Sequence, residues 1–214
     1  MLLLAMSTTA CEGAPSRSPS NGAHLFKSDP RFDGAPIART EAQLFCVRVA
    51  AAVRQLLGKL PEAELEDAEE PARDHECRVH ARRGEALPTT ELTLWISFSE
   101  LTGTLQEGVE RGLERNGPGA SECQLYVAEA AEPKTVRLGR RDVCVVSYDS
   151  TTGDSITAQG FYTTRRTRIQ VAVKTYVGPD STVRITPVQA EQIRDHALEA
   201  LIAETDARPS PNQS

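Results

Sequence analysis

The 214-residue sequence has few aromatic residues, 5% of the total, and lacks the motifs that mark the best-known active sites. It contains no HExxH, GxSxG, GxGxxG or GxxxxGK[ST] pattern, so no zinc protease, serine hydrolase, dinucleotide-binding or P-loop site is predicted. Its four histidines are scattered and suggest no metal site. The sequence therefore predicts no catalytic residue, no cofactor and no metal ligand.

Paired cysteines of the CxxC type are also missing, which argues against a zinc knuckle or a thioredoxin-like motif. Apart from Cys11, the chain has four widely spaced cysteines, and in an exported domain such cysteines usually form two disulfides. Of the three possible pairings we predict Cys46–Cys77 and Cys123–Cys144. Cys46 would pin a helix to a strand, and the other two would join neighbouring strands. In a cytosolic protein all five would instead be buried free thiols.

Composition is otherwise ordinary: 39% of the residues are hydrophobic, 25% are charged and the formal net charge is −6. A chain of this size and composition can bury the core of one globular domain. The mild acidity argues against a nucleic-acid partner, since nucleic-acid-binding domains usually carry a basic face.

The N-terminal stretch is apolar from Leu2 to Met6, continues with small residues to Cys11 and then turns polar. It resembles the end of a bacterial lipoprotein signal, and this resemblance implies that Cys11 is lipidated and anchors the chain to a membrane. The alternative is an N-terminal segment with an incidental cysteine. Residues 12–40 are rich in Gly, Pro, Ser and Asn and are predicted to be a flexible linker.

Three helices are expected. Capping boxes begin at Thr40, Thr104 and Thr186, and apolar residues at helical spacing follow each one. The first helix should cover 41–57 and the last should run from Pro187 to about residue 204. The polar segment 206–214 should be a disordered tail.

Alternating apolar residues predict a hairpin of strands at 76–83 and 91–98. From residue 120 onward the pattern indicates further strands, one of them bearing Cys123. Short turns between consecutive strands mean an antiparallel sheet. The fold class is therefore α+β: an antiparallel sheet of about five to seven strands with three helices packed mainly on one face. A single domain should span 41–205.

A possible binding surface contains Trp95, which shares the more polar face of its strand with Thr93 and Ser97. Exposed tryptophans are common binding anchors, although a helix or the linker covering this one is the alternative. Two arginine clusters near predicted turns would form a basic patch if the turns meet at one end of the sheet; otherwise they are solvated hairpin ends. The arginines are Arg137, Arg140, Arg141, Arg165, Arg166 and Arg168.

The whole arrangement resembles small lipoproteins of unknown function from actinobacteria. The resemblance rests on the Thr-Thr-Ala-Cys11 segment, the linker, the helix that bears Cys46 and ends at Gly58, and the strand that opens around Cys77. It implies no established activity and no catalytic residues.

Three functional hypotheses follow from the sequence. The first is a membrane-tethered extracytoplasmic lipoprotein that acts as a binding or accessory module of the cell envelope. Its partners would be the membrane, through the lipid anchor, and an envelope polymer or protein, but no nucleic acid. The second is a cell-envelope hydrolase with an unrecognised active site, and the third is a secreted or cytosolic structural protein.

Overall fold

A computed structural model describes residues 21–56, 63–67, 74–81, 90–126, 133–149, 155–177 and 185–207. These ranges form one antiparallel sheet of seven strands in the order β1-β2-β3-β7-β6-β5-β4. Its strands are β1 (Ala63–Asp67), β2 (Asp74–Ala81), β3 (Thr90–Glu100), β4 (Lys134–Leu138), β5 (Arg141–Asp149), β6 (Ser155–Thr164) and β7 (Thr167–Val177). The predicted α+β class is confirmed, as is the antiparallel pairing of the β2–β3 hairpin.

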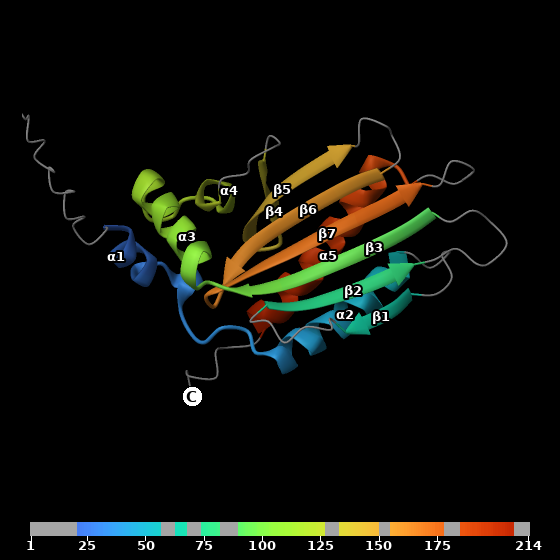
Figure 1. The fold of residues 1–214 in the computed structure, drawn as a ribbon, viewed down its shortest axis with the longest axis horizontal. Coiled ribbons are helices and arrows are strands. Elements are labelled where there is room, and N and C mark those ends of the chain that lie inside the picture. The colour runs from blue at the N-terminus through green and yellow to red at the C-terminus, as the bar shows by residue number, and fades with distance from the viewer. Residues whose placement is uncertain are drawn as a thin grey trace, which may run out of the picture.

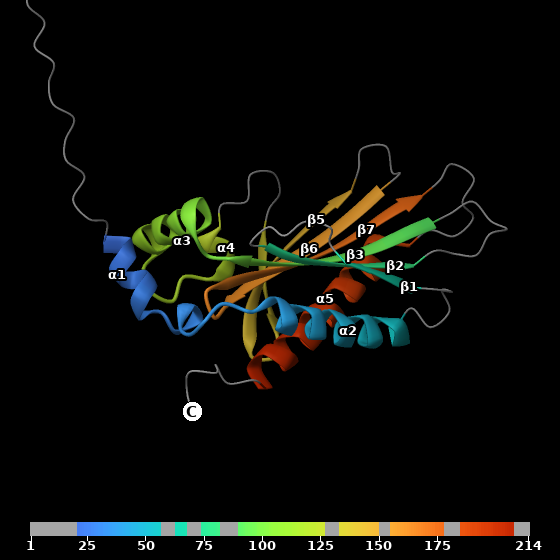
Figure 2. The same ribbon diagram turned by 60° about the horizontal axis from the view of Figure 1, so that its bottom comes forward.

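Two long helices, α2 (Arg39–Leu56) and α5 (Pro187–Ala207), cover one face of the sheet (Figures 1 and 2). The reason can be seen in the burial of strand β3, where every second residue is buried and the residues between are only partly covered. The buried residues are Leu92, Leu94, Ile96 and Phe98. Alternation of this kind gives a sheet one apolar face, which must be covered by another layer. Helix α5 comes so close to β6 that a Cβ at Gly160 would lie 2.6 Å from Leu198.

The long helices begin at capping residues. At α5 the predicted capping box is confirmed: the Thr186 N–H donates to Gln189 Oε1 at 2.9 Å, and the Gln189 N–H donates to Thr186 Oγ1 at 3.2 Å. Helix α2 starts earlier than predicted, at Arg39, and Glu41 Oε2 accepts a hydrogen bond from the Ala38 N–H at 3.2 Å. The predicted box at Thr40 therefore lies inside the first turn, because Glu41 satisfies the free N–H of the residue that precedes the helix.

A smaller helical lobe packs against the other face at one end of the sheet (Figure 1). It consists of α1 (Asn21–Ser28), the 3-10 turn η1 (Pro30–Phe32), α3 (Gly103–Asn116) and α4 (Glu122–Leu125). Its apolar residues form a second cluster with Cys144 and Phe161 of the sheet. Along β6 the burial pattern changes from alternating to continuous after Gln159, which marks where this lobe begins to cover the second face.

The predicted linker is wrong for residues 21–40. Phe26 and Phe32 are each 4% exposed and stack with their ring centroids 4.3 Å apart, and Ile37 is buried in the main core. Polar and Gly/Pro-rich composition suggested a linker, but a few apolar residues are enough to fold a segment when an existing surface receives them. The described fold therefore includes residues well before 41.

The C-terminal boundary also moves. Helix α5 extends to Ala207, and Asp206 lies within it and accepts a hydrogen bond from Arg141 Nε at 2.9 Å. Cys11, the rest of segment 1–20 and residues 208–214 lie outside the described residues. Helices of the described ranges are all too short or too polar to traverse a lipid bilayer.

One of the two predicted disulfides is confirmed. Cys123 and Cys144 are bonded, with Cα atoms 4.9 Å apart. Cys123 reaches its partner from the short helix α4 and not from a strand as predicted, because Ser121 and Gln124 form a capping box that starts a helical turn there. The bond fastens the helical lobe to strand β5.

The predicted Cys46–Cys77 disulfide is wrong. Cys46 is a buried free thiol, and it shares the main core with Cys77 without a bond between them. Cys46 belongs to helix α2 and Cys77 to strand β2, two layers held apart by the side chains packed between them. A disulfide needs Cα atoms within about 7 Å, which residues on separate layers seldom satisfy.

Candidate functional site

Both arginine-bearing hairpins lie at the same end of the sheet. Arg140 and Arg141 of the β4–β5 hairpin and Arg165 of the β6–β7 hairpin line one open cleft of about 1210 Å³, together with Arg31 of η1. The two turns therefore do meet, which is the condition that the sequence left open for a basic patch.

The cleft is not a basic patch, because most of these arginines already have acidic partners. Arg137 bonds to Asp142 at 2.9 Å, Arg141 bonds to Asp206, and Arg165 makes hydrogen bonds of 3.0 and 3.1 Å to Glu41. Acids from α2, β5 and α5 neutralise the hairpin ends, and the sequence pattern of arginines alone could not show this. Arg140 is exposed at the rim, with no bonded partner among the described residues.

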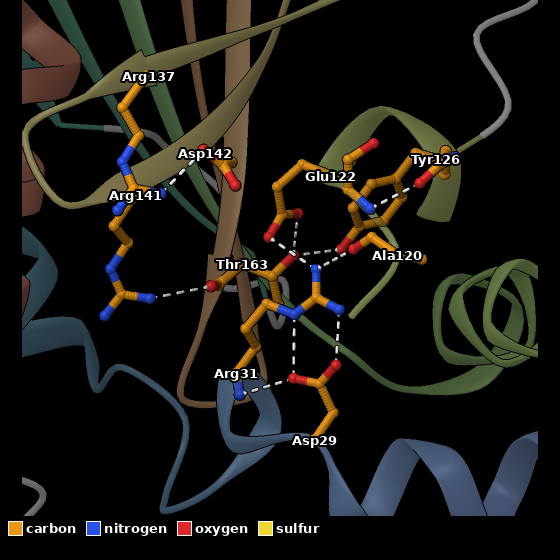
Figure 3. A network of polar contacts seen from close by, with 11 residues as sticks. Asp29, Arg31, Ala120, Glu122, Tyr126, Arg137, Arg141, Asp142 and Thr163 are labelled. Carbon is orange, nitrogen blue, oxygen red and sulfur yellow. Dashed lines mark hydrogen bonds and ion pairs between the residues drawn. The ribbon is translucent and has the colours of Figure 1, made fainter. Parts of the chain in front are cut away.

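One wall of this cleft holds a polar network centred on Arg31 (Figure 3). The Arg31 guanidinium donates from Nε and Nη2 to the two oxygens of Asp29 at 2.9 and 2.6 Å, and from Nη1 to the Ala120 carbonyl at 2.7 Å. Nη1 also lies 3.5 Å from Glu122 Oε1. One guanidinium thus joins the η1 segment to the start of α4.

Glu122 is 3% exposed, and this burial raises its pKa to about 7 despite the nearby charge of Arg31 and a hydrogen bond from Thr163. For Asp29, burial raises the pKa, but the hydrogen bonds and charge of Arg31 outweigh it and leave the pKa below its usual value. Two carboxyls on one guanidinium therefore have opposite shifts. At neutral pH, Asp29 is therefore ionised, and Glu122 is close to the midpoint of its titration.

Thr163 of β6 completes the network. Its hydroxyl donates to Glu122 Oε2 at 3.0 Å, so the Tyr126 hydroxyl, 2.7 Å away, donates to Thr163 in turn. Burial raises the pKa of Tyr126, which therefore stays protonated as this donation requires. The chain of bonds fastens the helical lobe to the sheet.

Away from the helical lobe, strands β2, β3 and β7 have no described helix on the face opposite α2 and α5 (Figure 1). Trp95 lies on this face of β3, opposite the buried Leu94 and Ile96. The Trp95 side chain is partly covered. Arg78 of β2 and Lys174 of β7 come from the strands on either side, with charges 5.2 and 4.7 Å from the ring centroid. A tryptophan flanked by two cations attracts them through its ring quadrupole, and it keeps both charges at this surface.

A small polar pocket of about 190 Å³ adjoins Trp95. Its walls come from β2, β3, β6 and β7, and its lining residues are Glu76, Trp95, Ser97, Gln159, Gln170, Ala172 and Lys174. The Gln170 side chain donates to Gln159 Oε1 at 3.4 Å, which orients both amides. Amide, hydroxyl and ammonium groups of this kind can bind a polar ligand.

Three buried side-chain nitrogens of the described residues have no hydrogen-bond partner: Trp95 Nε1, Arg166 Nε and Arg168 Nε. All three are donors. Buried polar groups are nearly always satisfied, so each of these unsatisfied nitrogens requires an explanation. Donors without acceptors favour a ligand that supplies acceptor oxygens.

Two of these donors, those of Arg166 and Arg168, belong to the β6–β7 hairpin. The turn of this hairpin is formed by Arg165 and Arg166, with φ of 51° and 54°. This is the left-handed conformation that two-residue hairpin turns require and that Asn or Gly normally provides. An ordinary side chain there costs about 1–2 kcal/mol. Arg168 follows on β7, with its guanidinium carbon 4.7 Å from the centroid of the Tyr126 ring and 4.5 Å from that of Phe161.

Metal binding has no support here: the described residues contain no group of three or more His, Cys, Asp or Glu side chains placed to hold an ion. No protein-family model matches the sequence. No curated protein matches it either.

The Asp29–Arg31–Glu122 network was missed at the sequence level. Asp29 caps η1 ahead of a proline, and Asp-Pro is a common turn signal that could have ended the linker earlier. Ser121 and Gln124 form the same kind of capping box that marked the long helices. Neither signal shows that the two segments meet, because they are far apart in the sequence.

Proposed function

We propose that this chain is a lipid-anchored extracytoplasmic module that binds an anionic polymer of the cell envelope across the open face of its sheet. Cys11 would carry the anchor, as the lipoprotein-like stretch before it suggests. The Cys123–Cys144 disulfide supports an oxidising compartment, where such bonds persist. The actinobacterial lipoproteins remain the family that the chain layout resembles.

The observation that carries the proposal is the surplus of donors and cations along the mostly polar face of β7, which runs from the open part of the sheet at Lys174 to the helical lobe at Arg168. Lys174 and Arg168 lie on the same face of β7, six residues apart, so their backbone positions are separated by roughly 20 Å. Trp95 pairs with Ala172 between them. A row of positive and donor groups of this length fits an extended chain with repeated anionic groups better than a single small ion.

The charge of the protein would restrict attraction of a polyanion to the immediate surroundings of the cations on this face. The whole chain has a net charge of −6, so it repels polyanions at long range. Arg78 contacts Glu76 only at 3.7 Å, and Lys174 makes no ion pair among the described residues. Attraction therefore depends on the few cations of this face, which makes each of them individually testable.

The test is a fluorescence titration of the protein with polyphosphate, with poly-L-glutamate as the carboxylate counterpart. Trp95 is the sole tryptophan, so its emission reports on this face alone. Lys174→Gln should weaken binding roughly fivefold, because a cation next to an aromatic ring contributes about 1 kcal/mol. Arg140→Gln removes the same charge from the exposed hairpin end and should change the affinity less than about twofold. Equal losses of affinity in the two variants would show that binding depends only on the net charge of the protein, and would contradict the proposal.

A hydrolase remains the second candidate, and the specific observation in its favour is Glu122. A carboxyl with a pKa of about 7 that lines a cleft can donate or accept a proton at neutral pH. The ionised Asp29 beside it resembles the division of roles seen in acid–base pairs. Hydrolysis of nitrophenyl glycosides or esters that is abolished by Glu122→Gln would support this candidate; no turnover by the wild-type protein would count against it.

A further inference from the structure

Arg168 is difficult to explain as a purely structural residue. Its guanidinium lies against the rings of Tyr126 and Phe161, and its Nε is buried without an acceptor. Within the described ranges no carboxylate and no carbonyl bonds to it. Buried cations are ordinarily paired, because removing a charge from water is costly unless an opposite charge or a hydrogen bond compensates.

The nearest acid does not fill this role. Glu122 acts on Arg168 only at a distance, since its two oxygens are used by Thr163 and Arg31. Burial lowers the pKa of Arg168, and Tyr126 and Glu122 offset this only in part. Arg168 as a whole is only partly buried, so some of its side chain remains accessible.

Arg166 lies two residues earlier and shares this condition. Within one turn, Arg165 and Arg166 adopt the same left-handed conformation, but only Arg165 has partners, namely Glu41 and the Ala35 carbonyl. Arg166 is fixed through its backbone, whose carbonyl accepts from the Leu101 N–H at 2.8 Å, and its Nε is left without an acceptor. The left-handed backbone of Arg166 is therefore strained, and its Nε makes no hydrogen bond that would compensate for this strain.

We propose that Arg166 and Arg168 together bind a phosphate group at the lobe end of the open sheet face. The planar fork of an arginine matches two oxygens of a phosphate, and two arginines match the charge of about −2 on a phosphate monoester or inorganic phosphate. A carboxylate carries half that charge. This proposal deepens the proposed function, because such a group would terminate or branch the polymer on the same face, but it does not depend on the polymer.

Inorganic phosphate is the probe, titrated into the full-length protein by calorimetry at low ionic strength. We expect saturable one-to-one binding, a loss of at least about tenfold in affinity for Arg168→Gln, and a nearly equal loss for Arg168→Lys, since lysine keeps the charge but not the fork. Arg140→Gln, which makes the same charge change at an exposed arginine, should leave the affinity within about twofold. Absence of saturation, or equal losses for Arg168→Gln and Arg140→Gln, would overturn the proposal.

A second variant keeps the test decisive if Arg168 variants fold poorly. Arg166→Gly relieves the left-handed strain and should raise Tm by roughly 2–4 °C, while still weakening phosphate binding several-fold. A variant that is more stable yet binds less well cannot be explained by misfolding. Unchanged phosphate affinity in a folded Arg166→Gly protein would contradict a role for this side chain.

The two proposals fail in distinguishable ways. Polyphosphate that still changes Trp95 emission in a protein unable to bind inorganic phosphate would eliminate the phosphate subsite and leave the polymer face standing. Binding of inorganic phosphate without any response to polyphosphate would identify a small phosphomonoester as the ligand and reject the polymer.

Discussion

Replacing Glu122 with glutamine should abolish a specific pH dependence of stability. Burial raises the pKa of Glu122 from 4.5 to about 7 in the folded protein. A raised pKa means that the folded state favours the protonated acid. The stabilisation that protonated Glu122 gives to the folded state is complete below pH 4.5 and is lost as the pH rises through 7. At about 1.4 kcal/mol per pKa unit, the loss is on the order of 3 kcal/mol.

Urea unfolding at several pH values between 4.5 and 8 measures this effect as the difference between wild type and Glu122→Gln. The amide can still accept the hydrogen bond from Thr163 but does not titrate. The wild-type free energy of unfolding should therefore fall by on the order of 3 kcal/mol relative to the variant across this range. Asp29 does not interfere, because its lowered pKa gives a contribution that is constant above its unfolded pKa of 3.8.

Glu107→Gln is the matched control, since it makes the same acid-to-amide change at a side chain that is 64% exposed. A wild-type minus Glu122→Gln difference that is flat from pH 4.5 to 8 would refute the argument. It would mean that Arg31 compensates fully for the burial of the carboxylate.

Further predictions concern the two sheet faces, the disulfide and the anchor. Trp95→Ala should cost roughly 1–2 kcal/mol in thermal or urea unfolding, whereas Phe98→Ala on the covered face of the same strand should cost about 3–5 kcal/mol; equal costs would make Trp95 a core residue. Replacing Cys123 and Cys144 by serine opens a loop with a sequence separation of 21, which should remove roughly 3 kcal/mol of stability, and an unbonded pair in non-reducing peptide maps would disprove the bond. Cys11→Ala should release the protein from the membrane fraction of its native host, and the anchor proposal fails if wild type is equally soluble.

The sequence predicted those parts of the fold that depend on local patterns. Period-two alternation located β2 and β3 because one face of each is buried, and the Thr186 capping box located α5 because its donors and acceptors are neighbours in the chain. Strand β1 was not predicted, since Ala63–Asp67 is rich in acids, which are rare in strands. At a sheet edge, charged residues are favourable because they discourage pairing with other chains.

The candidate sites were predicted only in part, because they depend on contacts between distant segments. Alternation placed Trp95 on the polar face, whereas the turn signals located the arginine hairpins but left open whether they meet at one end of the sheet. Local patterns could not reveal that Glu41 and Asp206 neutralise Arg165 and Arg141, since these pairs join different layers. The same limit explains why the linker prediction is wrong for residues 21–40.

Binding at the open sheet face can be measured at the indole N–H of Trp95, followed by proton–nitrogen NMR during titration with polyphosphate. The chain has a single tryptophan, so one indole cross-peak reports on this donor. Trp95 lines the small polar pocket and its Nε1 is buried without an acceptor, so we expect a saturable shift of this peak when polyphosphate occupies the pocket. The shift should be weaker at the same ligand concentration in Lys174→Gln. An indole peak that stays in place while polyphosphate binds would show that the ligand binds elsewhere and that the open sheet face is not the binding site.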